Sequence, residues 1–148
     1  MKSLSIALFT LFIFGCDSSI SPSTPDTEQS ILDENIQNWE NQNLASYQYT
    51  YKTSCFCPPE EDIVITVTNG SISEAFYTPG GVYLTTERIS TLPTVMDLFG
   101  KIQAAIDNNA FSLVVTYNDQ LGYPIRIAID QNEMIVDEEI THIVSNLQ

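Results

Sequence analysis

The dipeptide Asn69-Gly70 constrains the fold of this chain more than any other feature of its sequence. It stands between residues 62–68 (DIVITVT) and residues 71–77 (SISEAFY), two runs rich in strand-forming residues. Asn and Gly both tolerate the positive φ angles of a tight turn, so this arrangement is typical of a two-residue β-hairpin. At least one pair of antiparallel strands is therefore predicted near the middle of the chain.

The turn also predicts which residues lie opposite each other across the hairpin. A two-residue turn pairs Val67 with Ile72 and Ile63 with Phe76. A Pro-Gly-Gly sequence then breaks the chain, and residues 82–85 (VYLT) are predicted to form a further short strand.

Two amphipathic helices are predicted, one on each side of the hairpin. Apolar residues at a spacing close to 3.6 indicate the first helix over residues 28–43, with Trp39 filling the core. The second follows Pro93, where Thr94 and Asp97 have the spacing of a capping box. Its predicted buried stripe comprises Val95, Leu98, Phe99, Ile102, Ala105 and Ile106.

Four more strands complete the predicted sheet. Tyr47, Tyr49 and Tyr51 alternate with polar residues, which indicates a strand with one apolar face. A half-buried sheet face explains this tyrosine ladder better than sugar stacking does. The later strands are predicted over residues 111–117, 125–130 and 134–144.

The order of the elements predicts the fold class. One helix, three or four strands, a second helix and three strands indicate an α+β domain with two helices and an antiparallel sheet. Tyr51 and Pro58 have the same spacing as Tyr117 and Pro124, and each pair follows a helix. The order is therefore also compatible with a duplicated α-β-β-β unit.

The N-terminal residues predict export. Residues 4–14 (LSIALFTLFIF) are uncharged and mostly apolar, but a membrane-spanning helix needs about 20 residues. A short apolar run directly after Lys2 is typical of a signal-peptide core. The run ends in Ile13-Phe14-Gly15-Cys16, which resembles the bacterial lipobox. The alternatives are an uncleaved anchor, or an ordinary signal peptide with a chance cysteine.

These features divide the chain into three parts. We predict a signal peptide over residues 1–15, then a lipidated Cys16 that begins a flexible tether over residues 16–27. The tether is rich in Ser, Thr, Pro and Asp, which cannot form a core. Residues 28–148 are long enough for a single domain. The predicted location is the cell envelope, with the domain facing the periplasm or the exterior, and the choice between inner and outer membrane stays open.

The charge of the chain excludes one class of function. The formal net charge is −14, with five Lys and Arg against 19 Asp and Glu. Such a chain repels phosphate backbones, so no nucleic-acid partner is expected.

The most chemically informative motif is Cys55-Phe56-Cys57. With Cys16 lipidated, the other two cysteines are expected to form a disulfide in an oxidising compartment. Residues i and i+2 of an extended strand lie roughly 6.5 Å apart at Cα, near the outer limit for this bond, so a bend is needed. Pro58-Pro59 can supply it. A redox-active pair, half of a metal site and two free thiols remain alternatives.

Residues suited to catalysis are few. No hydrolase signature and no phosphate-binding glycine loop occur in the sequence. His142 is the only histidine and is predicted to be a strand residue rather than a base. Solvation explains the acidic residues near the C-terminus better than calcium binding does. These residues are Asp130, Asp137, Glu138 and Glu139. We therefore predict no catalytic residue, no metal and no cofactor.

Several of these motifs occur together in one family. They are Trp39, Tyr47-Gln48-Tyr49, Cys55-Phe56-Cys57, Val67-Thr68-Asn69-Gly70, Leu98-Phe99, Tyr117, Gly122-Tyr123-Pro124, Ile129-Asp130 and Asp137-Glu138. Over about residues 36–144 the chain resembles a family of uncharacterised bacterial lipoproteins, catalogued as domain of unknown function 6174. The Cys-Phe-Cys and Gly-Tyr-Pro motifs are its specific parts, and Asp137-Glu138 replaces a frequent pair of aspartates. The resemblance implies an envelope location and no assigned reaction.

Together these inferences predict a membrane-tethered envelope protein whose domain binds a protein or ligand without catalysis. The first alternative is a thiol-disulfide redox protein or sensor that uses Cys55 and Cys57. The second is a protein inhibitor or an envelope assembly factor, which rests on fold analogy alone.

Overall fold

The computed structural model describes residues 25–135 and 137–148. The predicted signal peptide, the predicted lipidation site Cys16 and most of the predicted tether lie outside the described residues. Among the helices described, none is long and apolar enough to span a membrane.

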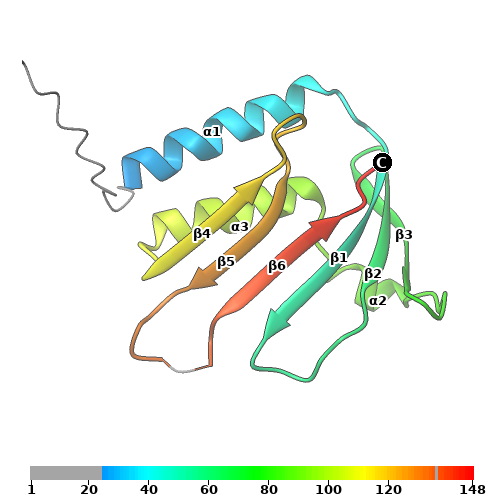
Figure 1. The fold of residues 1–148 in the computed structure, drawn as a ribbon. Helices are drawn as coiled ribbons and strands as arrows, with labels where there is room; N and C mark the ends of the chain where they lie inside the picture. Colours follow the sequence, from blue (N-terminus) through cyan, green and yellow to red (C-terminus); the bar gives the residue numbers. More distant parts are fainter. Residues whose placement is uncertain (1–24, 136) are drawn as a thin grey trace, which may run out of the picture.

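Six strands form one antiparallel sheet, and the two long helices lie against the same face of it (Figure 1). This arrangement confirms the predicted α+β class. The strands lie in the order β3-β2-β1-β6-β5-β4 across the sheet. The elements are α1 (Pro25–Asn41), β1 (Tyr47–Cys55), β2 (Ile63–Thr68), β3 (Ser71–Tyr77), α2 (Thr86–Ile89), α3 (Val95–Asp107), β4 (Ser112–Tyr117), β5 (Pro124–Asp130) and β6 (Ile140–Ser145).

The α-β-β-β order occurs twice along the chain, but the two halves are not related as a repeat in space. β1 and β6 run antiparallel, so β1 and its counterpart β4 point in opposite directions. Superposing the halves would turn the sheet over and place α1 and α3 on opposite faces. Both helices instead cover one face, where they contact each other.

The first helix starts and ends earlier than predicted. It covers Pro25–Asn41 rather than residues 28–43, so residues 25–27 of the predicted tether are helical. Pro is favoured at the first helical position because its N–H has no helical partner there and its φ angle suits the helix. Asn43 has a φ of 52°, a left-handed conformation that commonly follows a helix end.

The tyrosine ladder of β1 holds the start of α3. The Tyr47 hydroxyl accepts a hydrogen bond of 3.1 Å from the backbone N–H of Val95, and the Tyr49 hydroxyl donates to the carbonyl of Pro93. The predicted capping box is present, with Thr94 and Asp97 bonding reciprocally. Burial raises the pKa of the Tyr49 hydroxyl. The ladder therefore belongs to the core, as predicted, with its polar ends used to position a helix.

The hairpin register is right at the turn and wrong at the far end. Val67 pairs with Ile72 as predicted, but Ile63 pairs with Tyr77 rather than Phe76 because the register shifts at Thr66/Val67. Without this bulge Glu74 would lie opposite Ile65, on the buried face. With the bulge Ala75 takes that place and is fully buried. The extra residue thus keeps a carboxylate out of the core.

Residues 82–85 do not form the predicted strand. A single bridge joins Tyr83 to Phe76, and α2 then begins at Thr86 with Thr85 as its N-cap. This four-residue helix was not predicted, because one turn has no apolar periodicity to detect.

The last strand starts at Ile140 and not at residue 134. Asn132 closes a turn in which its carbonyl accepts from the N–H of Ile135 and its side chain accepts from the N–H of Met134. Asp137 then has a φ of 71°, which is incompatible with a strand. The apolar residues at 134 and 135 therefore belong to a loop.

The Gly-Tyr-Pro motif packs directly on α1. Gly122 has a φ of +79°, and a Cβ there would lie 2.6 Å from the carbonyl oxygen of Asn35. Tyr123 meets the indole of Trp39 edge-on, with ring centroids 6.1 Å apart, and Pro124 is fully buried at the start of β5. Trp39 also packs against Tyr47, so the motif joins the β4–β5 loop to the core.

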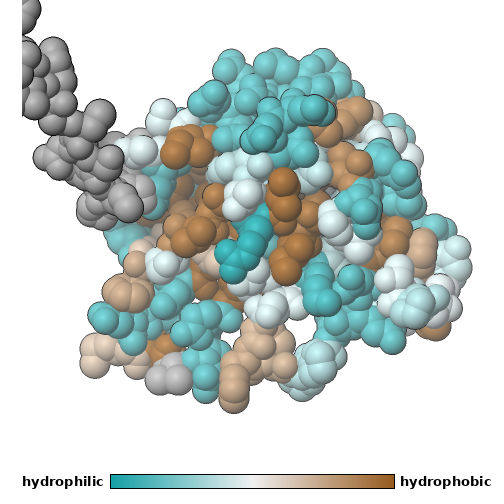
Figure 2. Space-filling model, viewed as in Figure 1, coloured by the Kyte–Doolittle hydropathy of each residue, from teal (hydrophilic) through white to brown (hydrophobic). Residues whose placement is uncertain are grey.

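The face of the sheet opposite the helices is open to solvent (Figure 2). Apolar and hydrophilic side chains alternate across it, as expected for an antiparallel sheet with one buried face. The core lies wholly between the sheet and the helices, and the strand ends carry the loops on which the candidate site is built.

Candidate functional site at the Cys-Phe-Cys end of the sheet

Two loops extend from the same end of the sheet, and we call this part of the molecule the Cys-Phe-Cys end. The first is the β1–β2 loop, which we define as residues 55–62, and the second is the β5–β6 loop of residues 131–139. Cys55, the last residue of β1, pairs with Ile140, the first residue of β6. Both loops consequently leave the sheet at the same end (Figure 1).

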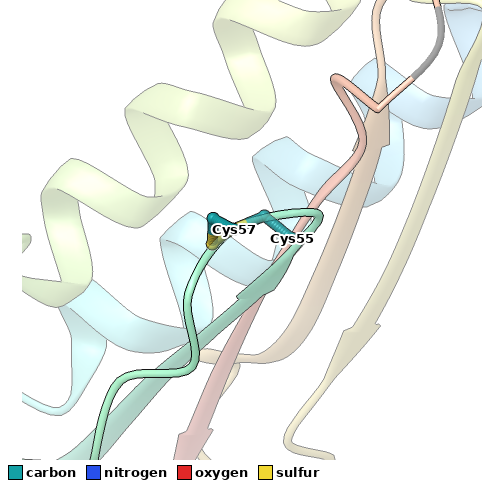
Figure 3. The surroundings of a disulfide bond; sticks show 2 residues. All are labelled: Cys55 and Cys57. Atoms are coloured by element: carbon teal, nitrogen blue, oxygen red, sulfur yellow. A yellow bond between two sulfur atoms is a disulfide. The ribbon is translucent and has the colours of Figure 1, made fainter.

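Cys55 and Cys57 form a disulfide bond in the structure (Figure 3). Their Cα atoms lie 5.2 Å apart, closer than the roughly 6.5 Å of an extended strand. The chain therefore bends immediately after β1, as the spacing of the cysteines required. A bond that closes so short a loop restrains local geometry more than it restrains the whole unfolded chain.

Large apolar side chains project into solvent from both loops. Phe56 is 81% exposed between the bonded cysteines, and on the neighbouring loop Met134 is 88% and Ile135 is 51% exposed. Apolar side chains gathered at exposed loop tips contribute nothing to the core. Such groups are typical of surfaces that bind another molecule.

Acidic residues surround these apolar tips. The two loops carry Glu60, Glu61, Asp62, Glu133, Asp137, Glu138 and Glu139. Lys52 compensates one of them through an ion pair of 2.9 Å with Asp62. The Cys-Phe-Cys end therefore combines exposed apolar groups with a negative surround.

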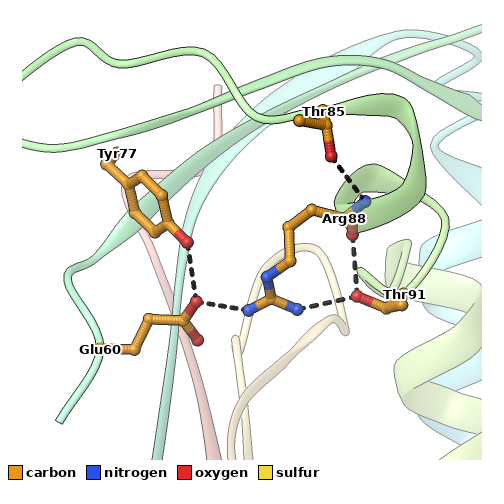
Figure 4. A network of polar contacts seen from close by, with 5 residues as sticks. All are labelled: Glu60, Tyr77, Thr85, Arg88 and Thr91. Atoms are coloured by element: carbon orange, nitrogen blue, oxygen red, sulfur yellow. Dashed lines mark hydrogen bonds and ion pairs between the residues drawn. The ribbon is translucent and has the colours of Figure 1, made fainter.

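A polar network fixes the β1–β2 loop to the segment around α2 (Figure 4). Glu60 accepts a 2.5 Å hydrogen bond from the Arg88 guanidinium and a 3.0 Å bond from the Tyr77 hydroxyl. Arg88 also donates to Thr91 at 2.7 Å. Partial burial acts to raise the pKa of Glu60, but the Arg88 and Tyr77 contacts outweigh it and the pKa is lowered. The network keeps Glu60 ionised and holds the loop in one position.

A buried polar pair lies on the core face of β1 and β6, next to this end. The Tyr51 hydroxyl is 2.7 Å from His142 Nδ1, and the two rings are stacked. Burial, with a smaller contribution from the Lys101 charge, lowers the pKa of His142 to about 4. Burial raises the pKa of Tyr51 to about 12. Both groups are therefore neutral at pH 7.

His142 lies where the sequence placed it, in a strand. It is 5% exposed, and among the described residues the one polar contact seen for it is the Tyr51 hydroxyl. Of the four acidic residues considered for calcium, Asp130 accepts from the backbone of Asn132 at 3.1 Å, and Asp137 and Glu139 are exposed. Among the described residues no group of three or more His, Cys, Asp or Glu could hold a metal ion.

Sequence reasoning missed two parts of this site. Glu60 and Arg88 are 28 residues apart, and Tyr51 and His142 are 91 apart. Local periodicity gives no information on contacts at such separations. The exposed position of Phe56 was also missed, although the two cysteines on either side of it were a usable signal.

Comparison with known families shows which family the chain belongs to. The fold and the site define a two-layer α+β domain with an exposed disulfide loop at one end of its sheet. The chain belongs to the family described as "Family of unknown function (DUF6174)", whose model matches residues 31–148. No curated protein and no solved structure matches the chain significantly.

Proposed function

We propose that this protein is a lipid-anchored envelope protein whose domain binds a partner protein through the Cys-Phe-Cys end, without catalysis. The observation that carries the proposal is Phe56, an aromatic side chain 81% exposed on a loop closed by a disulfide. Aromatic residues, Phe included, are enriched at protein interfaces relative to the rest of the surface.

The disulfide supports a binding role because it restricts the conformations of the loop before a partner arrives. A loop that is already ordered loses less entropy on binding, so more of the contact energy contributes to affinity. The Glu60–Arg88 contact holds the same loop from its other side. Phe56 is thus presented from a loop with two restraints.

The charges around Phe56 define the chemistry of the partner. Five of the seven acids of the two loops have no ion pair among the described residues, and these five favour a protein with an apolar pocket rimmed by Lys or Arg. The same charges oppose insertion of Phe56 among anionic lipid headgroups.

The tether supports the envelope location. Eight residues lie between Cys16 and the first helical residue, Pro25, and can span at most about 30 Å. A lipid on Cys16 would therefore keep the domain close to the membrane surface. The partner is accordingly expected in the membrane or near it.

Anchoring is tested by the substitution Cys16→Ser. Loss of the acceptor cysteine should release the protein from membranes or stall its processing. The measurement is fractionation of cells with immunoblotting. Normal processing with continued membrane fractionation would refute the anchor.

Docking is tested with a photo-crosslinking amino acid at position 56 in cells. Leu44, which is 41% exposed between α1 and β1, provides a matched apolar position at the opposite end of the sheet. We expect one adduct from position 56, weakened at least tenfold by Cys55→Ser/Cys57→Ser, and none from position 44. Equal adducts at both positions, or none at 56, would contradict the proposal.

The redox alternative is tested by an insulin-reduction assay and by equilibrating the pair in glutathione buffers. A structural disulfide should show no turnover and a potential below about −300 mV. Turnover that Cys55→Ala abolishes, or a potential of roughly −200 mV or higher, would instead indicate a redox protein.

A further inference from the structure

The two edges of the sheet differ in how they meet solvent. At the β3 edge the chain folds back, and residues 82 and 84 exchange backbone hydrogen bonds of 2.9 Å with Tyr77 and Ala75. This edge also carries the β-bulge at Ser73 and the charge of Glu74. Coverage, bulges and charges are the usual means of preventing an edge strand from pairing with another chain.

The β4 edge has none of these protections among the described residues. Ser112–Tyr117 (SLVVTY) contains no charge and no proline, and its backbone hydrogen bonds are made with β5 alone. Val114 is 52% exposed. β4 therefore presents a row of unpaired N–H and C=O groups along an apolar strand.

An apolar groove runs beside this edge. It has a volume of about 280 Å³ and lies between β4, α1 and α3. Ile31, Ile106, Leu113 and Val115 contribute to its lining, and Ile31 is 44% exposed. Side chains at alternate positions of a strand added to β4 would point into this groove.

One acidic group lines the groove, and two more lie beside a contact between the two helices. Gln29 of α1 and Gln103 of α3 bond to each other reciprocally, at 2.9 and 2.8 Å. Each also bonds a carboxylate, Asp33 for Gln29 and Asp107 for Gln103. Glu28 lines the groove itself.

The described cations lie elsewhere on the surface. Arg126 lies opposite Thr116 on the open face of the sheet. Lys101 of α3 lies near enough to His142 for its charge to lower the pKa of that side chain. Lys52 and Arg88 are paired at the Cys-Phe-Cys end. Among the described residues that line the groove, the one charged side chain is therefore the acid Glu28, and none is Lys or Arg.

We propose that β4 is a strand-addition site that accepts an extended segment of a partner protein. The segment carries apolar residues at alternate positions and Lys or Arg at its ends. Main-chain hydrogen bonds to β4 supply the affinity, and the groove selects the side chains. A second copy of this chain fits poorly, because each copy carries a formal net charge of −14.

The test uses the protein purified from envelopes in detergent and a labelled peptide, Lys-Val-Thr-Val-Thr-Val-Thr-Val-Lys, followed by fluorescence anisotropy. We expect saturable binding that is at least tenfold weaker when Glu replaces both Lys residues of the peptide. In hydrogen-exchange measurements the peptide should protect amides of Ser112–Tyr117. Absence of binding, or binding without protection of β4, would overturn the proposal.

Matched variants locate the site. Ile31→Lys should weaken peptide binding at least tenfold by placing a cation in the groove. Met96→Lys, at a helical position 45% exposed at the start of α3, should leave the affinity unchanged. Phe56→Ala should also leave it unchanged, and loss of binding in that variant would assign the peptide to the Cys-Phe-Cys end. A dimer in sedimentation that Ile31→Lys disrupts would show that a second copy occupies β4, and would overturn the proposal.

Discussion

Two loops carry the most distinctive short motifs of this sequence, and they are built in opposite ways. In the β4–β5 loop, Gly122-Tyr123-Pro124 packs on α1 so closely that no side chain fits at position 122. In the β1–β2 loop, Cys55-Phe56-Cys57 leaves the sheet, and its central residue packs on nothing in the core. Packing thus accounts for every residue of the first motif and leaves Phe56 of the second unexplained.

The difference shows how a motif can be assigned a role without knowing the reaction or the ligand. A motif whose substitution would create a clash or a cavity is explained by stability. An exposed apolar residue held in place by a covalent bond has no such explanation. We therefore expect the function at the Cys-Phe-Cys end. The following predictions measure how much each of the two loops contributes to stability.

The largest effect is expected from Gly122→Ala. A Cβ would lie 2.6 Å from the Asn35 carbonyl oxygen and 2.8 Å from Asn38 Cβ, at a φ of +79°. Left-handed strain and overpacking together should cost about 3 kcal/mol or more of unfolding free energy in urea titrations. The control is Gly100→Ala in α3, where a Cβ meets nothing within 4 Å and helix propensity should add about 0.5–1 kcal/mol. Equal effects of the two substitutions would contradict the packing argument.

The second effect is the pH dependence that His142 confers on the region beneath the Cys-Phe-Cys end. Its folded pKa of about 4 lies below an unfolded value near 6.5, so the unfolded state binds the proton more tightly. The stability is complete above about pH 6.5 and should fall by about 3 kcal/mol as the pH drops toward 4.

His142→Gln isolates this contribution, because Gln keeps a polar partner for Tyr51 without titrating. Between pH 7 and pH 4 the wild-type protein should lose more unfolding free energy than the His142→Gln variant does. Parallel pH profiles would refute the buried neutral histidine.

A smaller effect is expected when the disulfide is removed. The double substitution Cys55→Ser/Cys57→Ser opens a loop of three residues, for which chain entropy alone predicts a loss of at most about 1.5 kcal/mol. Thermal unfolding followed by circular dichroism measures it. A loss as large as that of Gly122→Ala would make the disulfide a main support of the fold and weaken the contrast between the loops.

The smallest effect is expected from Phe56→Ala. A side chain 81% exposed should contribute no more than about 0.5 kcal/mol to the unfolding free energy. The matched aromatic is Tyr123, 7% exposed against Trp39, whose replacement by Ala should cost about 3 kcal/mol. A substantial loss of stability on Phe56→Ala would mean that Phe56 packs after all, and the proposed interface would lose its anchor.

Short-range signals predicted most of the elements. Asn69-Gly70 located the hairpin, the Thr94–Asp97 spacing located the start of α3, and the alternating tyrosines identified the buried face of β1. Each signal reflects a requirement that a few neighbouring residues satisfy by themselves.

The wrong predictions concern positions whose structure is determined by distant parts of the molecule. Without the bulge in β3, Glu74 would lie on the buried face of the sheet. Which face is buried is not decided by the residues next to Glu74. Residues 134 and 135 are apolar enough for a strand but lie within the turn that Asn132 closes. At the candidate site the cysteines were visible in the sequence, whereas the Glu60–Arg88 and Tyr51–His142 contacts depend on a strand order that no local pattern encodes.

The position of β6 decides when this chain can finish folding. β6 is the last of the six strands along the sequence, yet it lies between β1 and β5, and Gln148 beyond it exchanges two backbone hydrogen bonds of 3.0 Å with Gln48. Without β6 the sheet would consist of two strand sets, β3-β2-β1 and β5-β4, with no strand pairing between them. The sheet is therefore completed only when β6 takes its place, and the contacts that complete it join residues that lie about as far apart along the domain as any, which are the slowest to form.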